Sequence, residues 1–122
     1  MSGAADKEQV EKVVSAVNRY LKDPSVGGVR LNTDFKEIKL NMGRGFGFAY
    51  GHKENGAMFS HMTIMYINAL YKRGFVKEGF EIIDMIYNHC CNFEKSRILP
   101  GVPEYINESG RGMYHYLTGA AS

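Results

Sequence analysis

The sequence predicts a mainly α-helical fold, of the all-α class, with long glycine-rich loops and a short β-hairpin. Apolar residues recur with the spacing of a helix in three segments, about residues 6–21, 57–73 and 76–92. The 14 glycines gather mostly between these segments, where aromatic residues and histidines accompany them. Such mixed segments usually line a site rather than fill a core.

The first helical segment, residues 6–21, has one apolar stripe. The residues of this stripe recur at intervals of three and four: Val10, Val13, Val14, Val17, Tyr20 and Leu21. The charged residues fall between them and should face water. Asp23-Pro24 and Gly27-Gly28 are expected to end the helix.

The second and third segments predict a helical hairpin. Gly74 suits the left-handed residue that closes a helix, and two helices joined by so short a link must pack antiparallel. The expected stripe of the second helix consists of Met58, Met62, Met65, Tyr66, Ala69 and Leu70, so its methionines should be core residues. The expected stripe of the third helix consists of Val76, Phe80, Ile83, Ile86, Tyr87 and Cys90.

The segments outside the helices are predicted to be irregular. Residues 29–40 favour a short strand or an extended, hairpin-like segment, and residues 43–51 lack the third glycine of a dinucleotide fingerprint. A functional loop of about twenty residues should follow Phe93. Residues 117–122 have the pattern of a first helical turn with Thr118 near its N-cap. We therefore expect residues 1–122 to form a single partial domain, whose open apolar face is covered by further helices.

Composition excludes several classes of protein. The net charge of +2 is too small to indicate a nucleic-acid-binding or membrane-surface protein, and no apolar run approaches the ~20 residues of a membrane span. The N-terminus lacks the pattern of a signal peptide. Cys90 and Cys91 are adjacent, which suits neither a disulfide scaffold nor a zinc cluster, and we expect them to fill the core at a helix end. The sequence thus predicts a cytoplasmic protein with reduced thiols and no bound metal.

Two segments contain candidate binding residues, residues 52–61 and 110–119. Lys53 and Glu54 can hydrogen-bond several hydroxyl groups, and the ring of His61, in the first turn of a helix, could donate to an anion. Thr118 and Gly119 present a hydroxyl and backbone N–H groups at a second helix start, where phosphate is attracted. If both helix starts converge, they form an oxyanion pocket edged by sugar-binding groups. Alternatively, these residues are a solvated surface pair, a structural histidine and an N-cap.

The same two segments resemble a known family. GHKENGAMFSH resembles the GYKENG-x-x-x-x-H segment of cellobiose phosphorylases and their relatives in glycoside hydrolase family 94, and LTGAAS resembles that family's LTGTAAW. The intervening text, SRILPGVPEYINESGRGMYHYLTG, looks closest to the β-1,2-oligoglucan phosphorylase branch. The resemblance runs from about Gly28 to the last residue. It implies that the chain is a segment of an (α/α)6-barrel catalytic domain.

The resemblance also implies a reaction and a role for each candidate residue. The family cleaves a β-glucosidic bond with inorganic phosphate and inverts configuration, giving α-glucose 1-phosphate. Phosphate replaces the water of an inverting hydrolase, so one general acid suffices and no cofactor is needed. By resemblance, His61, Thr118 and Gly119 match the residues that contact phosphate. Lys53 and Glu54 match residues that hold the acceptor sugar. The expected partners are phosphate, a β-glucoside or oligoglucan, the remainder of the barrel and a possible second copy of the chain.

The sequence departs from the family at several positions. His52 replaces a tyrosine and Ser60 a cysteine that cellobiose phosphorylases commonly carry, which leaves the acceptor sugar and the linkage open. The family's general acid is an Asp whose surroundings are not matched here, and we do not assign Asp34 to that role. We expect the chain to be inactive alone.

Two other functions remain open from the sequence. A helical-hairpin interaction module without catalytic activity would explain the paired helices, although no copy recurs at a ~34-residue period. A glycoside hydrolase of similar fold would need two carboxyl groups about 6.5–9.5 Å apart, for which Glu54 and Glu104 are candidates.

Overall fold

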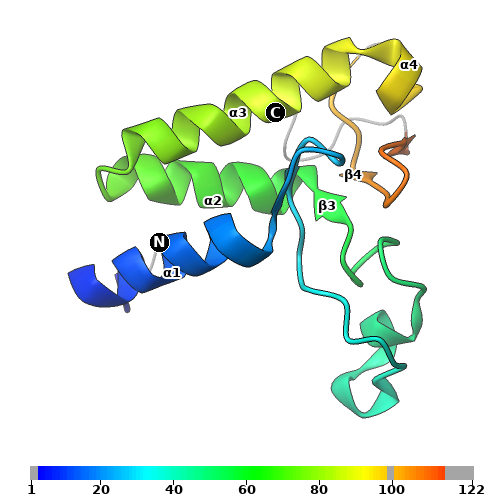
Figure 1. The fold of residues 1–122 in the computed structure, drawn as a ribbon, viewed down its shortest axis with the longest axis horizontal. Helices are drawn as coiled ribbons and strands as arrows, with labels where there is room; N and C mark the ends of the chain where they lie inside the picture. The colour runs from blue at the N-terminus through cyan, green and yellow to red at the C-terminus, as the bar shows by residue number, and fades with distance from the viewer. Residues whose placement is uncertain (1–2, 99–100, 115–122) are drawn as a thin grey trace.

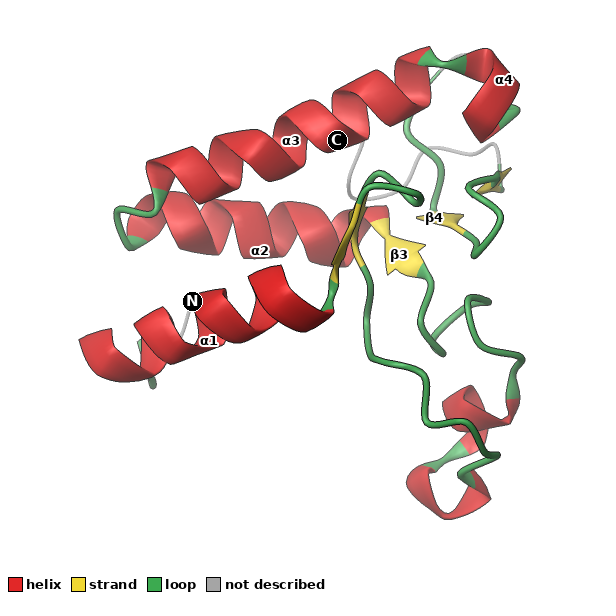
Figure 2. Ribbon diagram, in the orientation of Figure 1, coloured by secondary structure: helices red, strands yellow, loops and turns green. Residues whose placement is uncertain are grey.

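The computed structural model describes residues 3–98 and 101–114. Three long helices lie on one side of the molecule, and short strands and loops lie on the other (Figure 1, Figure 2). The helices are α1 (Lys7–Tyr20), α2 (Ser60–Lys72), α3 (Val76–Cys91) and the single turn α4 (Phe93–Ser96). The strands are β1 (Lys22–Asp23), β2 (Gly28–Val29), β3 (Met58–Phe59), β4 (Tyr105–Ile106) and β5 (Gly112–Met113), and two 3-10 turns span Leu40–Met42 and Arg44–Gly47. The mainly helical class with small antiparallel strands is confirmed.

Helix α1 begins at a capping box. The Asp6 carboxylate accepts from the Gln9 backbone N–H at 2.8 Å, and the Gln9 side chain accepts from the Asp6 N–H at 2.9 Å. Two of the unpaired donors of the helix start are thereby satisfied. Val14 is buried, whereas Val13 and Tyr20 of the predicted stripe are exposed. The helix is confirmed, with a narrower buried face than expected.

The link between α2 and α3 is confirmed as a tight helix ending at Gly74. Gly74 has φ +85°, its N–H donates to the Tyr71 carbonyl at 3.1 Å, and the Phe75 N–H donates to the Leu70 carbonyl at 2.9 Å. This pair of bonds is the Schellman motif, which needs a left-handed residue at the glycine position. Phe75 then packs against the core. The motif turns the chain so that α3 returns along α2 (Figure 1).

The predicted stripe of α2 is wrong in its first half. Met62 and Met65 are 50% and 54% exposed, and the buried row of the helix is Ser60, Thr63, Ile67 and Leu70. The small side chains of Ser60 and Thr63 let the start of the helix approach the sheet closely. Periodicity identified the helix but not the inward face, because polar residues occupy half of the buried row. Only Met58, which precedes the helix, is a core methionine as predicted.

The predicted stripe of α3 is also largely wrong. Its buried residues are Gly79, Ile82, Ile86 and His89, whereas Val76, Phe80, Ile83 and Tyr87 are exposed. Apolar residues therefore occupy two faces of this helix, and the chain itself covers one of them. Helices that are apolar on more than one face are typical of the interior of larger proteins.

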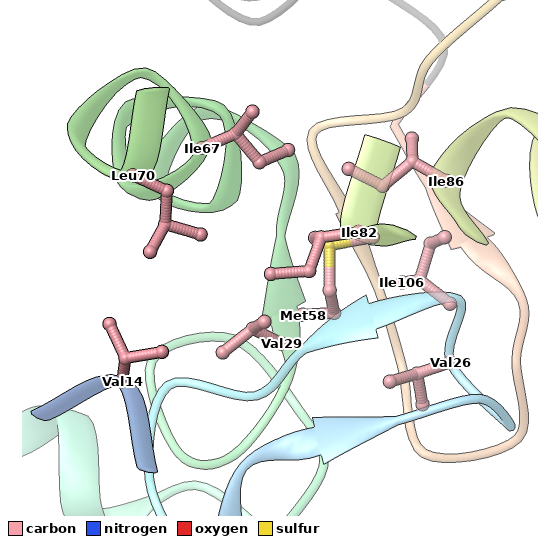
Figure 3. Close-up of a cluster of buried hydrophobic side chains, with 9 residues drawn as sticks. All are labelled: Val14, Val26, Val29, Met58, Ile67, Leu70, Ile82, Ile86 and Ile106. Atoms are coloured by element: carbon pink, nitrogen blue, oxygen red, sulfur yellow. The ribbon is translucent and has the colours of Figure 1, made fainter. Parts of the chain in front are cut away.

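The core lies where the helices meet the two small sheets (Figure 3). It consists of Val14, Val26, Val29, Met58, Ile67, Leu70, Ile82, Ile86 and Ile106. Every long helix contributes to this cluster, as do strands β2, β3 and β4. The cluster therefore fixes the strands relative to the helices.

The strands differ from the predicted loops in two places. The first hairpin pairs β1 with β2, so it lies at residues 22–29 and not within residues 29–40 as predicted. After Phe93 the chain forms α4 and then the antiparallel hairpin of β4 and β5, where a loop was predicted. Asn107 closes this hairpin because its side-chain oxygen accepts from the backbone N–H groups of Ser109 and Arg111.

The two cysteines have different surroundings. Cys90 is half-buried against the core, and burial together with the neighbouring Cys91 raises the pKa of its thiol to about 11. Cys91 is exposed, so the expectation that both fill the core is wrong for Cys91. None of the helices in the described ranges has the length and apolar character that a bilayer crossing requires.

The first prediction tests which face of α3 is inward. Ile82→Ala should lower the free energy of unfolding by about 2–5 kcal/mol, because it opens a cavity in the core. Phe80→Ala, two residues earlier on the exposed face, should change it by less than about 0.5 kcal/mol. Urea unfolding followed by circular dichroism measures both values. A larger loss for Phe80→Ala than for Ile82→Ala would reverse the assignment of the two faces.

The second prediction concerns thiol reactivity. Because the thiolate is the reactive form, Cys90 with its raised pKa should react with iodoacetamide at pH 8 at least about tenfold more slowly than exposed Cys91. Peptide mass spectrometry of a labelling time course measures both rates. In denaturant the two rates should converge, and equal rates in the folded chain would contradict the burial of Cys90.

Candidate functional site

The motif Lys53-Glu54-Asn55-Gly56 forms a tight turn. The Asn55 N–H donates to the His52 carbonyl at 3.1 Å, and the Gly51 N–H donates to the Asn55 carbonyl at 2.7 Å. Lys53 has φ +47° and Gly56 has φ +79°, both left-handed. A lysine in this region is strained, and such strain is maintained only where the surroundings impose it. The turn is therefore a fixed structure that presents Lys53 and Glu54 in a set direction.

Asparagine side chains impose this turn. The Asn55 side chain donates to the Phe48 carbonyl at 2.7 Å, and the Asn32 side-chain oxygen accepts from the Gly56 N–H at 2.9 Å. The Asn32 and Asn55 side chains also bond to each other at 3.1 Å. These bonds satisfy the amide groups of Asn55, which is buried.

Two more distant segments hold the same turn. Arg30 donates to the Gly56 carbonyl at 2.9 Å and forms an ion pair with Asp23 at 2.7 Å, so it connects the turn to the first hairpin. The Glu108 N–H donates to the Gly51 carbonyl at 3.0 Å, which connects the turn to the β4–β5 hairpin. Segments far apart in the sequence are thereby joined at the candidate site.

Strand pairing brings the second part of the site beside this turn. In the sheet of order β3-β4-β5, Phe59 pairs with Tyr105 and Met58 with Ile106. Side chains alternate between the two faces of a sheet, so paired residues share a face. Met58 and Ile106 are fully buried in the core, whereas Phe59 and Tyr105 stack on the opposite face with ring centroids 5.1 Å apart. The sheet therefore has a core face and an aromatic face.

An open cleft lies between the turn and the aromatic face. Its lining residues are Lys53, Glu54, Phe59, Glu104, Tyr105 and Tyr114. Burial, and then the nearby Tyr114, Glu104 and Glu54, raise the pKa of the Tyr105 hydroxyl. The cleft measures about 220 Å³, below the about 300–1,000 Å³ of complete small-molecule sites. It is large enough for part of a ligand.

His61 follows the cleft residue Phe59 closely in the sequence and lies in the first turn of α2. The residue is exposed, and among residues 3–98 and 101–114 no side chain caps the helix start. The Ser60 N–H donates to the Glu104 carbonyl at 3.0 Å, which places the Glu104 strand at the first residue of the helix. A helix start of this kind offers backbone donors and the positive end of its dipole. His61 does not line the cleft, so the structure places it near the sugar-binding candidates without joining it to them.

The other sequence-derived candidates have mixed outcomes. Lys53 and Glu54 occupy one cleft, and within the described ranges neither forms an ion pair; the Lys53 ammonium lies 5.2 Å from the Phe48 ring centre. Thr118 and Gly119 lie outside the described residues. The Lys36 ammonium bonds the Asp34 carboxylate and lowers the pKa of Asp34, which is the opposite of what a general acid requires.

Sequence reasoning missed the aromatic residues of the cleft. Phe59, Tyr105 and Tyr114 were not proposed for the site, and Glu104 was considered only as half of a hydrolase pair. The tyrosine-rich character of residues 105–116 was the one visible indication. A second hollow, about 200 Å³ between α1 and α2, is lined mainly by apolar residues such as Val10, Val14 and Leu70. Tyr66 and Arg73 are the polar residues among its described lining, whereas charged and polar side chains line most of the cleft at Lys53, which is the better candidate for chemistry.

Comparison with known proteins settles the family. The model of the glycosyl hydrolase 94 superfamily catalytic domain matches residues 1–122. The chain belongs to this family. The resemblance stated from the two motifs is thus confirmed over the whole sequence.

One curated relative is a cellobionic acid phosphorylase from Neurospora crassa. It is 31% identical over 74 residues, which is 61% of this chain and 9% of the relative. The chain thus matches a small part of that phosphorylase. The likeness supports a phosphorylase-type function at the level of the family.

The third prediction tests whether the turn positions Lys53 and Glu54. A Cβ on Gly56 would lie 2.1 Å from the Tyr50 ring, whereas at Gly43, also at positive φ, it would meet nothing within 4 Å. Either change to alanine should cost about 1–3 kcal/mol of unfolding free energy through backbone strain. Gly56→Ala should cost a further ~1–3 kcal/mol through overpacking. Urea unfolding measures the difference, and equal losses for the two variants would contradict the fixed turn.

Proposed function

We propose that the chain supplies phosphate-binding and sugar-binding residues to an inverting β-glucoside phosphorylase. The observation that supports this most is the cleft in which the turn carries Lys53 and Glu54 beside the uncapped start of α2. In this proposal a β-linked glucan or disaccharide is cleaved by phosphate to α-glucose 1-phosphate. Inorganic phosphate is the co-substrate.

The chemistry divides between two groups of residues. Phosphate is the nucleophile and needs a site that holds a dianion beneath the anomeric carbon. The His61 ring and the backbone donors at the start of α2 suit that task. Thr118 and Gly119 are proposed to complete the phosphate site. Lys53 donates to sugar hydroxyls and Glu54 accepts from them, so together they orient the sugar beside the bond that breaks.

The proposal requires residues beyond this chain. A general acid must protonate the leaving oxygen, and Asp34, bonded to Lys36, is unsuited to it. The second apolar face of α3 supports the proposal that further helices of an (α/α)6 barrel pack against it. We therefore propose a partial catalytic domain that is inactive alone.

A hydrolase is the second candidate, because Glu54 and Glu104 line one cleft. A hydrolase would activate water with one carboxylate and protonate the leaving oxygen with the other. It would make no use of phosphate at His61. Phosphate binding therefore distinguishes the two candidates.

The fourth prediction is a phosphate titration of the isotopically labelled chain. The amides and the imidazole of the His61 region should shift with phosphate but not with chloride at equal ionic strength. His61→Gln should abolish the shifts, because it removes the ring donor at the helix start.

His52→Gln is the matched control, because it removes an imidazole from the same segment outside the helix. It should leave the phosphate response unchanged. A folded chain without any phosphate response at the His61 region would sink the phosphorylase assignment. It would favour the hydrolase or a helical-hairpin interaction module.

A further inference from the structure

The cleft carries more negative than positive charge. Glu54 and Glu104 contribute two carboxylates, and Lys53 contributes the single cation among the lining residues. Within the described ranges neither carboxylate forms an ion pair. The Lys53 ammonium lies over the Phe48 ring instead, at 5.2 Å from its centre. Both carboxylates are thus available to accept hydrogen bonds from a ligand.

Glu104 is held in place by its own backbone. Its carbonyl accepts from the Ser60 N–H at 3.0 Å, and the next residue, Tyr105, pairs with Phe59. The Glu104 side chain is half-buried, whereas that of Glu54 is exposed. Glu104 therefore presents its carboxylate from the residue before β4, in the cleft that Glu54 of the turn also lines.

The remaining wall of the cleft is aromatic. Phe59 and Tyr105 stack at 5.1 Å with their planes 15° apart, and Tyr114 meets Tyr105 edge-on at 5.8 Å. Tyr105 is only 2% exposed, so Phe59 and Tyr114 supply most of the accessible aromatic surface. Small-molecule sites combine such apolar and aromatic walls with a few convergent polar groups. The arrangement suits a ring with apolar faces and hydroxyl groups around its edge, which describes a pyranose.

Backbone strain gives independent support for a ligand site. Four non-glycine residues of the described ranges have positive φ, and two of them, Lys53 at +47° and Tyr114 at +66°, line this cleft. Residues in this conformation gather at ligand-binding sites, where the surrounding structure imposes them.

We propose that Glu104 is a further sugar-binding residue of this cleft, and that the two carboxylates select a neutral sugar ring over one that carries a carboxylate. The inference rests on the proposed function, because it takes the cleft as the sugar site. Neutral hydroxyls donate to both carboxylates in charge-assisted hydrogen bonds. An anionic sugar would bring a third negative charge into a cleft that holds a single cation, and like charges within one cleft repel each other.

A ring-matched pair of ligands tests the proposal on the 122-residue chain. Methyl β-D-glucopyranoside and methyl β-D-glucuronide share one ring and differ by a carboxylate in place of a hydroxymethyl group. Each is titrated while the amide shifts of Lys53, Glu54 and Tyr105 are followed. The glucoside should bind at least about tenfold more tightly than the glucuronide, and added salt should narrow the difference.

Three variants test whether the charges of Glu104 and Lys53 cause the difference in affinity between the two ligands. Glu104→Gln should weaken glucoside binding and narrow the discrimination between the two ligands. Glu108→Gln, on the same hairpin but outside the cleft, should change neither. Lys53→Met removes the cation and should increase the ratio of glucoside to glucuronide affinity. Glu104→Gln and Lys53→Met should therefore change this ratio in opposite directions.

Other outcomes overturn the proposal. Equal binding of the two ligands, no binding of either, or a Glu104→Gln variant that behaves like Glu108→Gln would each do so. The phosphate titration at His61 is run on the same samples. A phosphate response that persists while the sugar result fails rejects the role of Glu104 and leaves the phosphate site standing. Loss of both responses rejects the proposed function itself.

Discussion

The pairing of β3 with β4 is the interaction on which the rest of the structure depends. Met58 and Ile106 point from these strands into the core and lose all contact with solvent. Phe59 and Tyr105, one position away on each strand, form the aromatic wall of the cleft. A slip of one residue would exchange the two faces, putting aromatic rings into a core shaped for Met58 and Ile106. The hydrophobic core thus sets the register, and the register sets which side chains face the cleft.

The same pairing connects the motif at residues 52–61 with the β4–β5 hairpin. The turn at residues 51–56 leads directly into β3 and α2, and the β4–β5 hairpin returns to bond Gly51 through the Glu108 N–H. Lys53 and Glu54 therefore meet Glu104 only because the strands meet. His61 is carried on α2, which follows β3 directly, so the chain connects His61 to the turn that carries Lys53 and Glu54.

Much of the fold could be predicted from the sequence, because helical spacing and turn chemistry are local properties. The three helices, the antiparallel hairpin and the left-handed Gly74 follow from the positions of apolar residues and glycine. The inward faces of α2 and α3 could not be predicted in this way. Met62 and Phe80 are as apolar as the buried Ile67 and Ile82, so periodicity cannot tell a face that the chain covers from one that it leaves exposed.

The candidate site was predictable only in part, for the same reason. Lys53, Glu54 and His61 could be named because they stand in a recognisable motif. Tyr105 and Glu104 reach the site because the two-residue strand β4 pairs with β3, which lies about 45 residues earlier in the sequence. Strands this short show almost no alternation of apolar and polar residues that a sequence analysis could detect. The hairpin turn at Asn107, with the sequence Asn-Glu-Ser-Gly, is a turn signal visible in the sequence, but it was interpreted as part of a loop.

The most direct test of this account is a measurement of proton–proton contacts between β3 and β4 in solution. Nuclear Overhauser spectra of the chain, selectively labelled at Phe, Tyr, Met and Ile, report which side chains face each other. The account predicts contacts between the rings of Phe59 and Tyr105 and between the side chains of Met58 and Ile106. Contacts of Met58 with Tyr105 instead would reveal a shifted register, and the cleft described here would not exist.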